Sequence, residues 1–136
     1  MTTKDFLQQA FFLDKDINLK LQELEALKSD LEKKTISYAS DGSQHTQSEN
    51  STERKLCKSI DLENEINNEI DNLVNKKRII RKSILSVSDR KLREVLTRRY
   101  LLFQTFERIS VEMHLELRWI YRLHKKALSK IKTIDH

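Results

Sequence analysis

The sequence predicts an all-α fold, and three observations support that class. Proline is absent and glycine occurs once, at Gly42, in 136 residues, whereas tight turns and β-hairpins depend on both residue types. Charged residues make up 35% of the chain and apolar residues only 38%, a balance that suits long helices with narrow buried stripes. Apolar residues also recur at three- and four-residue steps through most of the chain, as they do in amphipathic helices.

The first predicted helix runs from about Thr3 to Lys34. Leu7, Phe11, Phe12 and Leu19 widen its apolar stripe, so we expect this helix to contact more than one surface. The stripe itself consists of Phe6, Ala10, Leu13, Ile17, Leu24, Leu27 and Leu31.

The next segment, residues 35–52, reads TISYASDGSQHTQSENST and is mostly polar around the single glycine. It has no apolar periodicity and little surface to bury. We predict a flexible, exposed loop.

A second helix is predicted from about Glu53 to Ser86, with a heptad-like stripe that only Lys77 interrupts. Two long helices with matching stripes and a connecting loop predict an antiparallel hairpin over residues 1–87. A parallel coiled-coil dimer is the alternative, although it would bring two Lys77 side chains together. The stripe consists of Ile66, Ile70, Leu73, Lys77, Ile80, Ile84 and Val87, and Leu56, Ile60 and Leu62 continue it less regularly.

A second domain is predicted over residues 88–136. Ser88 is the expected N-cap of a third helix, with Asp89 in its first turn. This domain holds 12 Lys or Arg against 6 Asp or Glu, whereas residues 1–87 hold 14 against 15. The uneven charge indicates that the C-terminal part meets a polyanion.

The stretch from Phe106 to Leu128, FERISVEMHLELRWIYRLHKKAL, predicts two short helices joined by a turn at Met113–Glu116. Ser110 supplies a small residue where the helices would cross. Such a pair could close a helical bundle or could form a DNA-binding helix-turn-helix. The apolar positions of the pair are Ile109, Met113, Leu115, Ile120 and Leu123.

The second of these helices, at about 116–132, has a basic face opposite an apolar one. At 100° per residue, Ile120, Leu123 and Ala127 share one face, and Trp119 is expected to pack against the third helix. Arginine bonds guanine bidentately in the major groove, and lysine and tyrosine reach phosphates or base edges. We therefore predict that double-stranded DNA is contacted by Arg118, Tyr121, Arg122, Lys125, Lys126, Leu117 and Arg108.

The segment TFERISVEMHLELRWIYRLHKKALSKI resembles the helix-turn-helix of the fourth region of bacterial sigma factors, and LREVLTRRYLLF is similar to the helix that precedes that motif. Two positions depart from the family pattern. His114 stands where the family has the turn glycine, and Glu116 stands where it has a serine cap. The positions that match in kind are Thr105, Phe106, Glu107, Ile109, Met113, Leu115, Ile120, Ala127, Leu128, Lys130 and Ile131.

Nearly the whole chain also resembles a family of small prophage proteins from Gram-positive bacteria. The resemblance rests on DLENEINNEIDNL in the second helix and on the RY, W and YRLH positions of the C-terminal part. It implies a phage transcription regulator.

Other classes of function are disfavoured. The sequence has no glycine-rich phosphate loop and no nucleophile–base motif, so we expect neither an enzyme nor a cofactor. His124 and His136 lack the spaced ligands of a metal site. The single cysteine, Cys57, and the lack of a long apolar run predict a soluble, intracellular protein without membrane contact. The resemblance to prophage proteins implies the cytoplasm of a bacterial host. Homodimerisation through the long helices is a further expectation, and an adaptor that binds RNA polymerase or another regulator is the alternative function.

Overall fold

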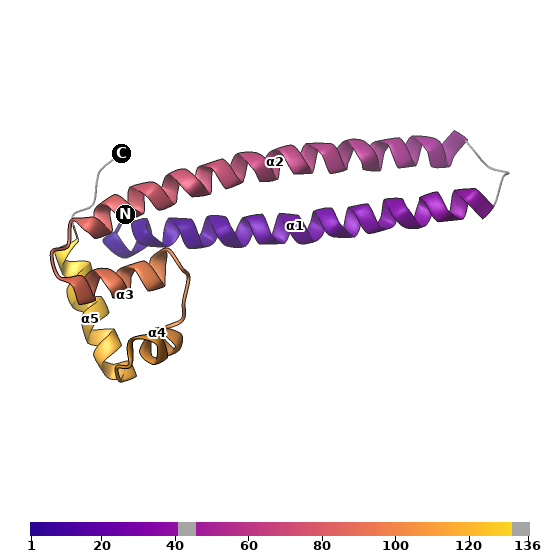
Figure 1. Cartoon of the computed structure of the whole chain (residues 1–136). Helices are drawn as coiled ribbons and strands as arrows, with labels where there is room; N and C mark the ends of the chain where they lie inside the picture. The colour runs from indigo at the N-terminus through magenta and orange to yellow at the C-terminus, as the bar shows by residue number, and fades with distance from the viewer. Residues whose placement is uncertain (41–45, 132–136) are drawn as a thin grey trace. The chain divides into compact units, whose positions relative to one another are not determined.

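The computed structural model describes the backbone of residues 1–40 and 46–131, and the side chains of residues 1–33 and 50–131. The described chain is all-helical and contains no strand (Figure 1), so the predicted all-α class is confirmed. The helices are α1 (Thr3–Ser40), α2 (Thr46–Leu85), α3 (Arg90–Tyr100), α4 (Phe106–Met113) and α5 (Leu117–Lys130).

The two long helices extend into the segment that the sequence predicts to be a loop. Helix α1 continues to Ser40 and α2 begins at Thr46, so the prediction of a loop is wrong for residues 35–40 and 46–52. Polar residues such as Ser, Thr and Gln cost only a few tenths of a kcal/mol in a helix, about 0.7 at most. Their abundance therefore does not end a helix without proline or glycine. Residues 41–45, which belong to the same prediction, lie outside the described residues.

The chain divides into two compact units. One comprises residues 1–14 and 72–136, and the other comprises residues 15–71. Both long helices contribute to both units, so the units are not successive along the chain. The domain boundary after Val87 remains a prediction. The two units described here are defined instead by the contacts within the folded chain.

Within the 15–71 unit, α1 and α2 pair through one buried line of residues and through ion pairs that are partly exposed. Ile17, Leu24, Ser59 and Ile66 are buried. Lysine–carboxylate pairs join the two helices, and their numbering falls on α2 as it rises on α1, which is the order of antiparallel neighbours. These pairs are Lys20–Glu65 at 3.6 Å, Lys20–Glu69, Lys28–Glu63 at 2.9 Å and Lys55–Asp30 at 3.3 Å.

The predicted stripe of α2 changes course at its N-terminal end. Leu56 and Ile60 were expected to continue the buried stripe, but they are 51% and 50% exposed. Ser59 is buried in their place, because it lies seven residues, close to two helical turns, before Ile66. The expectation for Leu56 and Ile60 is therefore wrong, and so is that for Ile70, a member of the predicted stripe that is 40% exposed.

The other unit is built around a core to which α1, α2, α3 and α5 all contribute. Ile80 and Ile84 are almost fully buried there, as the apolar periodicity predicts. The buried cluster consists of Leu7, Ala10, Ile80, Ile84, Val87, Leu92, Leu96, Tyr100, Leu101, Ala127 and Ile131.

Helix α3 begins at a side-chain cap and is followed by a residue with positive φ. Its N-cap is Asp89, whose carboxylate accepts hydrogen bonds from the N–H groups of Lys91 and Leu92. The prediction of Ser88 as the cap is wrong by one residue, since either side chain can fill this role. After the helix, Phe103 adopts φ 57°, and its ring lies 5.8 Å from that of Phe11 and under the ammonium of Lys77.

Candidate nucleic-acid interface

Helix α5 has one buried face and one exposed face. Ile120 and Ala127 are completely buried, and Leu123 is half-buried. Because one face of α5 is fixed in the core, the opposite face is held toward solvent. The exposed side chains are Arg118, Trp119, Tyr121, Arg122, Lys125 and Lys126, and Leu117 at the start of the helix is half-buried.

A three-residue turn sets the direction in which α5 leaves α4. His114 adopts the left-handed conformation, with φ 55° and ψ 40°, in which residues other than glycine are uncommon. The hydroxyl of Ser110 donates to the carbonyl of Leu115, whose own N–H bonds to the Ser110 carbonyl at 3.1 Å. Ser110 thus closes the turn with both its backbone and its side chain. The interruption falls inside the Met113–Glu116 stretch predicted for the turn.

The two helices of this pair differ in how they begin. The Thr105 hydroxyl accepts from the N–H of Arg108 at 3.2 Å and caps α4. At the start of α5, Glu116 makes no side-chain capping bond. The departure from a serine cap at Glu116 therefore leaves the first turn of α5 without that stabilisation.

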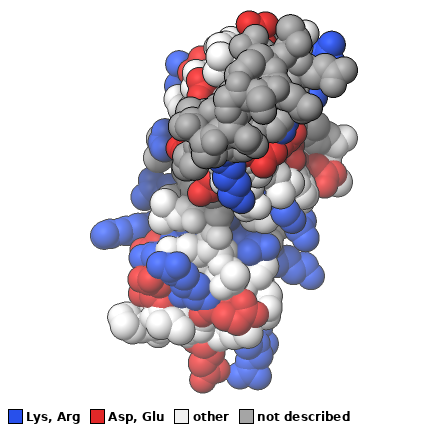
Figure 2. Space-filling model, turned by 90° about the vertical axis from the view of Figure 1, so that its right-hand side faces the viewer, with Lys and Arg blue, Asp and Glu red and all other residues white. Residues whose placement is uncertain are grey.

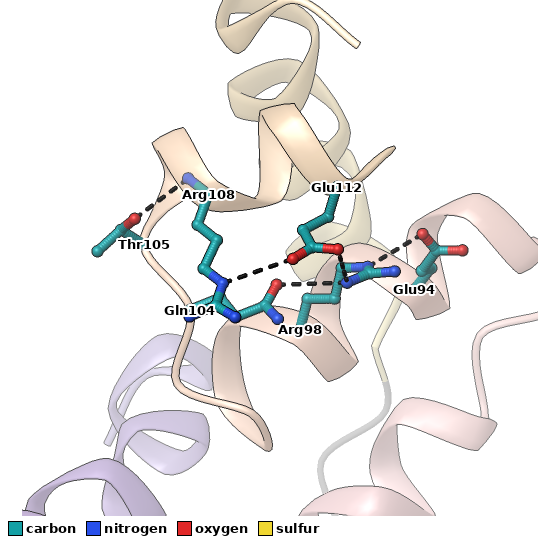
Figure 3. A network of polar contacts seen from close by, with 6 residues as sticks. All are labelled: Glu94, Arg98, Gln104, Thr105, Arg108 and Glu112. Carbon is teal, nitrogen blue, oxygen red and sulfur yellow. Dashed lines mark hydrogen bonds and ion pairs between the residues drawn. The ribbon is translucent and has the colours of Figure 1, made fainter. Parts of the chain in front are cut away.

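A polar network joins α3 to α4 and involves two of the arginines near the turn (Figure 3). Arg98 bonds the carboxylates of Glu94 at 3.1 Å and Glu112 at 3.8 Å, and it contacts Gln104. Arg98 is only 24% exposed, so these acids and Gln104 account for its charge and its hydrogen bonds. Arg98 therefore has a structural role, because it joins α3 to α4.

Arg108, a predicted DNA contact, belongs to the same network but remains accessible. Its Nε lies 3.6 Å from Glu112, and its side chain is 67% exposed. An ion pair this exposed contributes only about 0–1 kcal/mol. Arg108 can therefore exchange Glu112 for another anion at little cost.

Behind α5 lies a buried aromatic group that the sequence did not reveal. The Tyr100 hydroxyl and His124 Nε2 form a hydrogen bond of 2.6 Å, and the Phe106 ring packs edge-on against His124 with centroids 4.9 Å apart. Burial, and to a smaller extent the charges of Arg99 and Lys4, lower the pKa of His124 to about 4. Burial raises the pKa of Tyr100 to about 12. The pair is neutral at pH 7 and holds α5 against α3.

At 100° per residue, His124 lies on the edge between the buried and exposed faces of α5, on the same side as Leu117. A histidine at the edge between the buried and exposed faces of a helix can point inward or outward. Here the hydrogen bond with Tyr100, which is 24 residues away in the sequence, holds the His124 side chain inward. The only sequence signal available was the apolar cluster around Tyr100.

Trp119 does not take the position expected for it. It is 50% exposed rather than buried against α3, and the guanidinium of Arg122 lies over its ring, 5.4 Å from the centroid. The expectation of a packing residue is therefore wrong. A cation over an aromatic face is attracted by the ring quadrupole, so Trp119 restricts where Arg122 can point.

Carboxylates accompany the basic residues. Arg118 lies 3.8 Å from Glu116, and both side chains are 74% exposed. On the face drawn in Figure 2, blue Lys and Arg atoms alternate with red Asp and Glu atoms instead of forming one continuous basic patch. On α5 itself, the Glu116 carboxylate offsets part of the charge that Arg118 presents to an anion.

The described residues contain no cluster of His, Cys, Asp and Glu that could hold a metal ion. None of the described helices combines the length and the apolar character that a membrane span needs.

Comparison of the chain with protein-family models, with curated proteins and with solved structures finds no match.

Proposed function

We propose that the protein is a sequence-specific DNA-binding regulator of transcription, encoded by a phage or prophage and active in the cytoplasm of its bacterial host. In this proposal α4, the turn at His114 and α5 form a helix-turn-helix similar to that of the fourth region of sigma factors. Helix α5 enters the major groove, and the long helices position or pair the subunits.

The observation that carries the proposal is the two-sided character of α5. A helix enters the major groove only if one face is anchored and the other offers donors. Ile120 and Ala127 provide the anchor, and Arg118, Arg122 and Lys125 are exposed along the other face. Restriction of Arg122 by Trp119 reduces the rotamer entropy that the arginine would lose on contact with a guanine.

The decisive experiment selects bound sequences from random double-stranded DNA with the purified chain. We expect one enriched motif, and we expect affinity for it to fall steeply as salt rises, because Lys and Arg displace counterions from phosphates. Flat enrichment would refute autonomous DNA specificity.

The variant Arg122→Ala then tests the assigned groove face. Loss of a base contact should weaken binding to the selected motif by about 1–3 kcal/mol and relax preference at one position. Lys125→Ala, as a phosphate contact, should weaken binding to all sequences alike. Arg54→Ala, exposed on the 15–71 unit, is the matched control and should change neither value. Unchanged affinity of the Arg122 variant would exclude this residue from the contact.

A second candidate function is an adaptor that binds RNA polymerase or another regulator. It is favoured by Phe11 and Phe12, which are 41% and 55% exposed and stack edge-to-face on the surface of their unit. Exposed aromatic side chains are typical of protein-binding surfaces. Gel shifts separate the two functions, because a DNA-binding regulator shifts its fragment alone and an adaptor does so only with its partner.

A further inference from the structure

Helix α2 carries a second apolar stripe that remains exposed. Leu56, Ile60 and Ile70 are 51%, 50% and 40% exposed. Together with Glu63 and Asn67 they follow alternating four- and three-residue steps. At 100° per residue this stripe is centred about 80° around the helix from the buried Ile66. One face of α2 is therefore buried within the 15–71 unit, and the apolar residues of a second heptad-spaced face stay exposed, with Glu63 among them paired to Lys28.

The residue types on this stripe match an antiparallel copy of themselves. In a heptad, Ile60 and Asn67 take the a positions, and Leu56, Glu63 and Ile70 take the d positions. An antiparallel pair of helices places a opposite d, so that Ile60 meets Ile70 of the other copy. The same register places Glu63 opposite Asn67. Apolar residues thus meet apolar ones, and the two polar residues meet each other.

We propose that this stripe binds a second copy of the chain, with the two α2 helices antiparallel about a two-fold axis near Glu65. The interface is isologous, so each contact occurs twice. The amide of Asn67 donates to the carboxylate of Glu63 in the other copy. A single polar layer of this kind fixes register and partner number in coiled coils at some cost in stability.

The surroundings of Glu63 make the polar layer feasible. Covering a carboxylate is costly unless it is paired and hydrogen-bonded. Lys28 of the same chain lies 2.9 Å from Glu63 and supplies the opposite charge, while Asn67 of the other copy supplies a hydrogen bond. A parallel, in-register pair would instead place the two Glu63 carboxylates opposite each other, which is unfavourable.

The charge at position 67 distinguishes these arrangements by sedimentation of the full chain without DNA. The wild type should sediment as a dimer of the 16.2 kDa chain. Asn67→Glu should dissociate it by facing Glu63, whereas Asn67→Lys should preserve it by facing the same carboxylate. The double variant Glu63→Lys with Asn67→Glu should regain the dimer. Helical content from circular dichroism should be unchanged in all three.

The exposed Cys57 gives an independent measurement. In the proposed register the two Cys57 residues are separated by roughly 16 residues of helix, or about 24 Å, whereas Cys57 lies close to Asp71 of the other copy. A short bismaleimide should therefore leave the wild type uncrosslinked and should crosslink the Asp71→Cys variant.

A wild type that sediments as a monomer would overturn the proposal. So would an Asn67→Glu variant that remains dimeric, or efficient crosslinking between the two native cysteines. Because every measurement is made without DNA, its outcome is separate from that of the DNA selection.

Discussion

The 15–71 unit and the C-terminal helices solve the same problem, the stabilisation of amphipathic helices, in different ways. In the 15–71 unit one line of residues such as Ile17 and Ile66 is buried, and exposed ion pairs flank it. Around α3, α4 and α5, side chains from several helices pack into the same core. The Asp89 cap, the left-handed residue His114 and the buried Tyr100–His124 hydrogen bond fix the positions of these helices.

The difference shows what each kind of packing specifies. A single stripe between two long helices fixes their axes and leaves the other faces open, as the exposed Leu56 and Ile60 illustrate. Convergent packing fixes the rotation of each short helix, and therefore which side chains it presents to solvent. A surface that must match a ligand in detail is therefore better built on short helices whose rotation is fixed by packing against several others.

The largest expected effect comes from a cavity in the convergent core. Ile120→Ala should lower the free energy of unfolding by up to about 5 kcal/mol, while Ile66→Ala should cost nearer about 2 kcal/mol, because two long helices can collapse onto a small cavity more easily. Urea denaturation followed by circular dichroism measures both. Trp119 is the only tryptophan and reports on α5 by fluorescence. Equal losses in the two variants would remove the distinction between the two kinds of packing.

Buried His124 predicts that the stability of the core between α3 and α5 depends on pH. The pKa of His124 is about 4 in the folded chain against an ordinary value of 6.5, so between these values the unfolded chain binds a proton that the folded chain does not. Stability should therefore be complete above pH 6.5 and should fall as pH drops toward 4, by on the order of 3 kcal/mol. Thermal melts across this range measure it.

His124→Gln is the control for that pH dependence. The amide can still bond the Tyr100 hydroxyl but does not titrate, so the fall in melting temperature below pH 6.5 should become shallower. An unchanged slope would assign the acid sensitivity to other groups.

A smaller gain is expected at the turn between α4 and α5. His114→Gly removes the steric cost of φ 55°, which for a side-chain-bearing residue is about 1–2 kcal/mol, and adds back part of it as unfolded-state entropy. We expect a net stabilisation of about 1 kcal/mol, seen as a higher melting temperature, and a lower one in His114→Val. A fall in the glycine variant would mean that the His114 side chain itself supports the turn.

The smallest effect is expected in the 15–71 unit. Asp30→Ala removes the ion pair with Lys55, whose side chains are 60% and 28% exposed respectively, and pairs near the surface contribute about 0–1 kcal/mol. Denaturation in low and high salt should give nearly the same small change. A larger loss would mean that the charges, and not the buried line, hold this unit together.

Periodicity predicts the elements well and their ends poorly. It places Ile80, Ile84, Ile120 and Ala127 in the core, because the 3.6-residue repeat is a local property. It misses the extension of the helices over residues 35–40 and 46–52, since polar residues tolerate a helix without favouring it.

Contacts between distant residues limit what the sequence reveals of the candidate interface. The exposed face of α5 follows from its own spacing, whereas the burial of His124 depends on Tyr100. The burial of His124 therefore does not follow from the sequence around α5 alone. Trp119 and Arg122, by contrast, are only three residues apart on α5, and the guanidinium lies over the indole ring.

Phe103 carries a further consequence for how freely this protein can change in sequence. Its backbone conformation would suit glycine, yet its ring lies against Phe11 and beneath Lys77. A glycine there would relax the backbone and lose both contacts, and another bulky residue would inherit the strain. Every replacement of Phe103 therefore either loses the ring contacts or keeps the backbone strain. We expect Phe103 to be replaced more slowly in related sequences than its exposed neighbour Leu102.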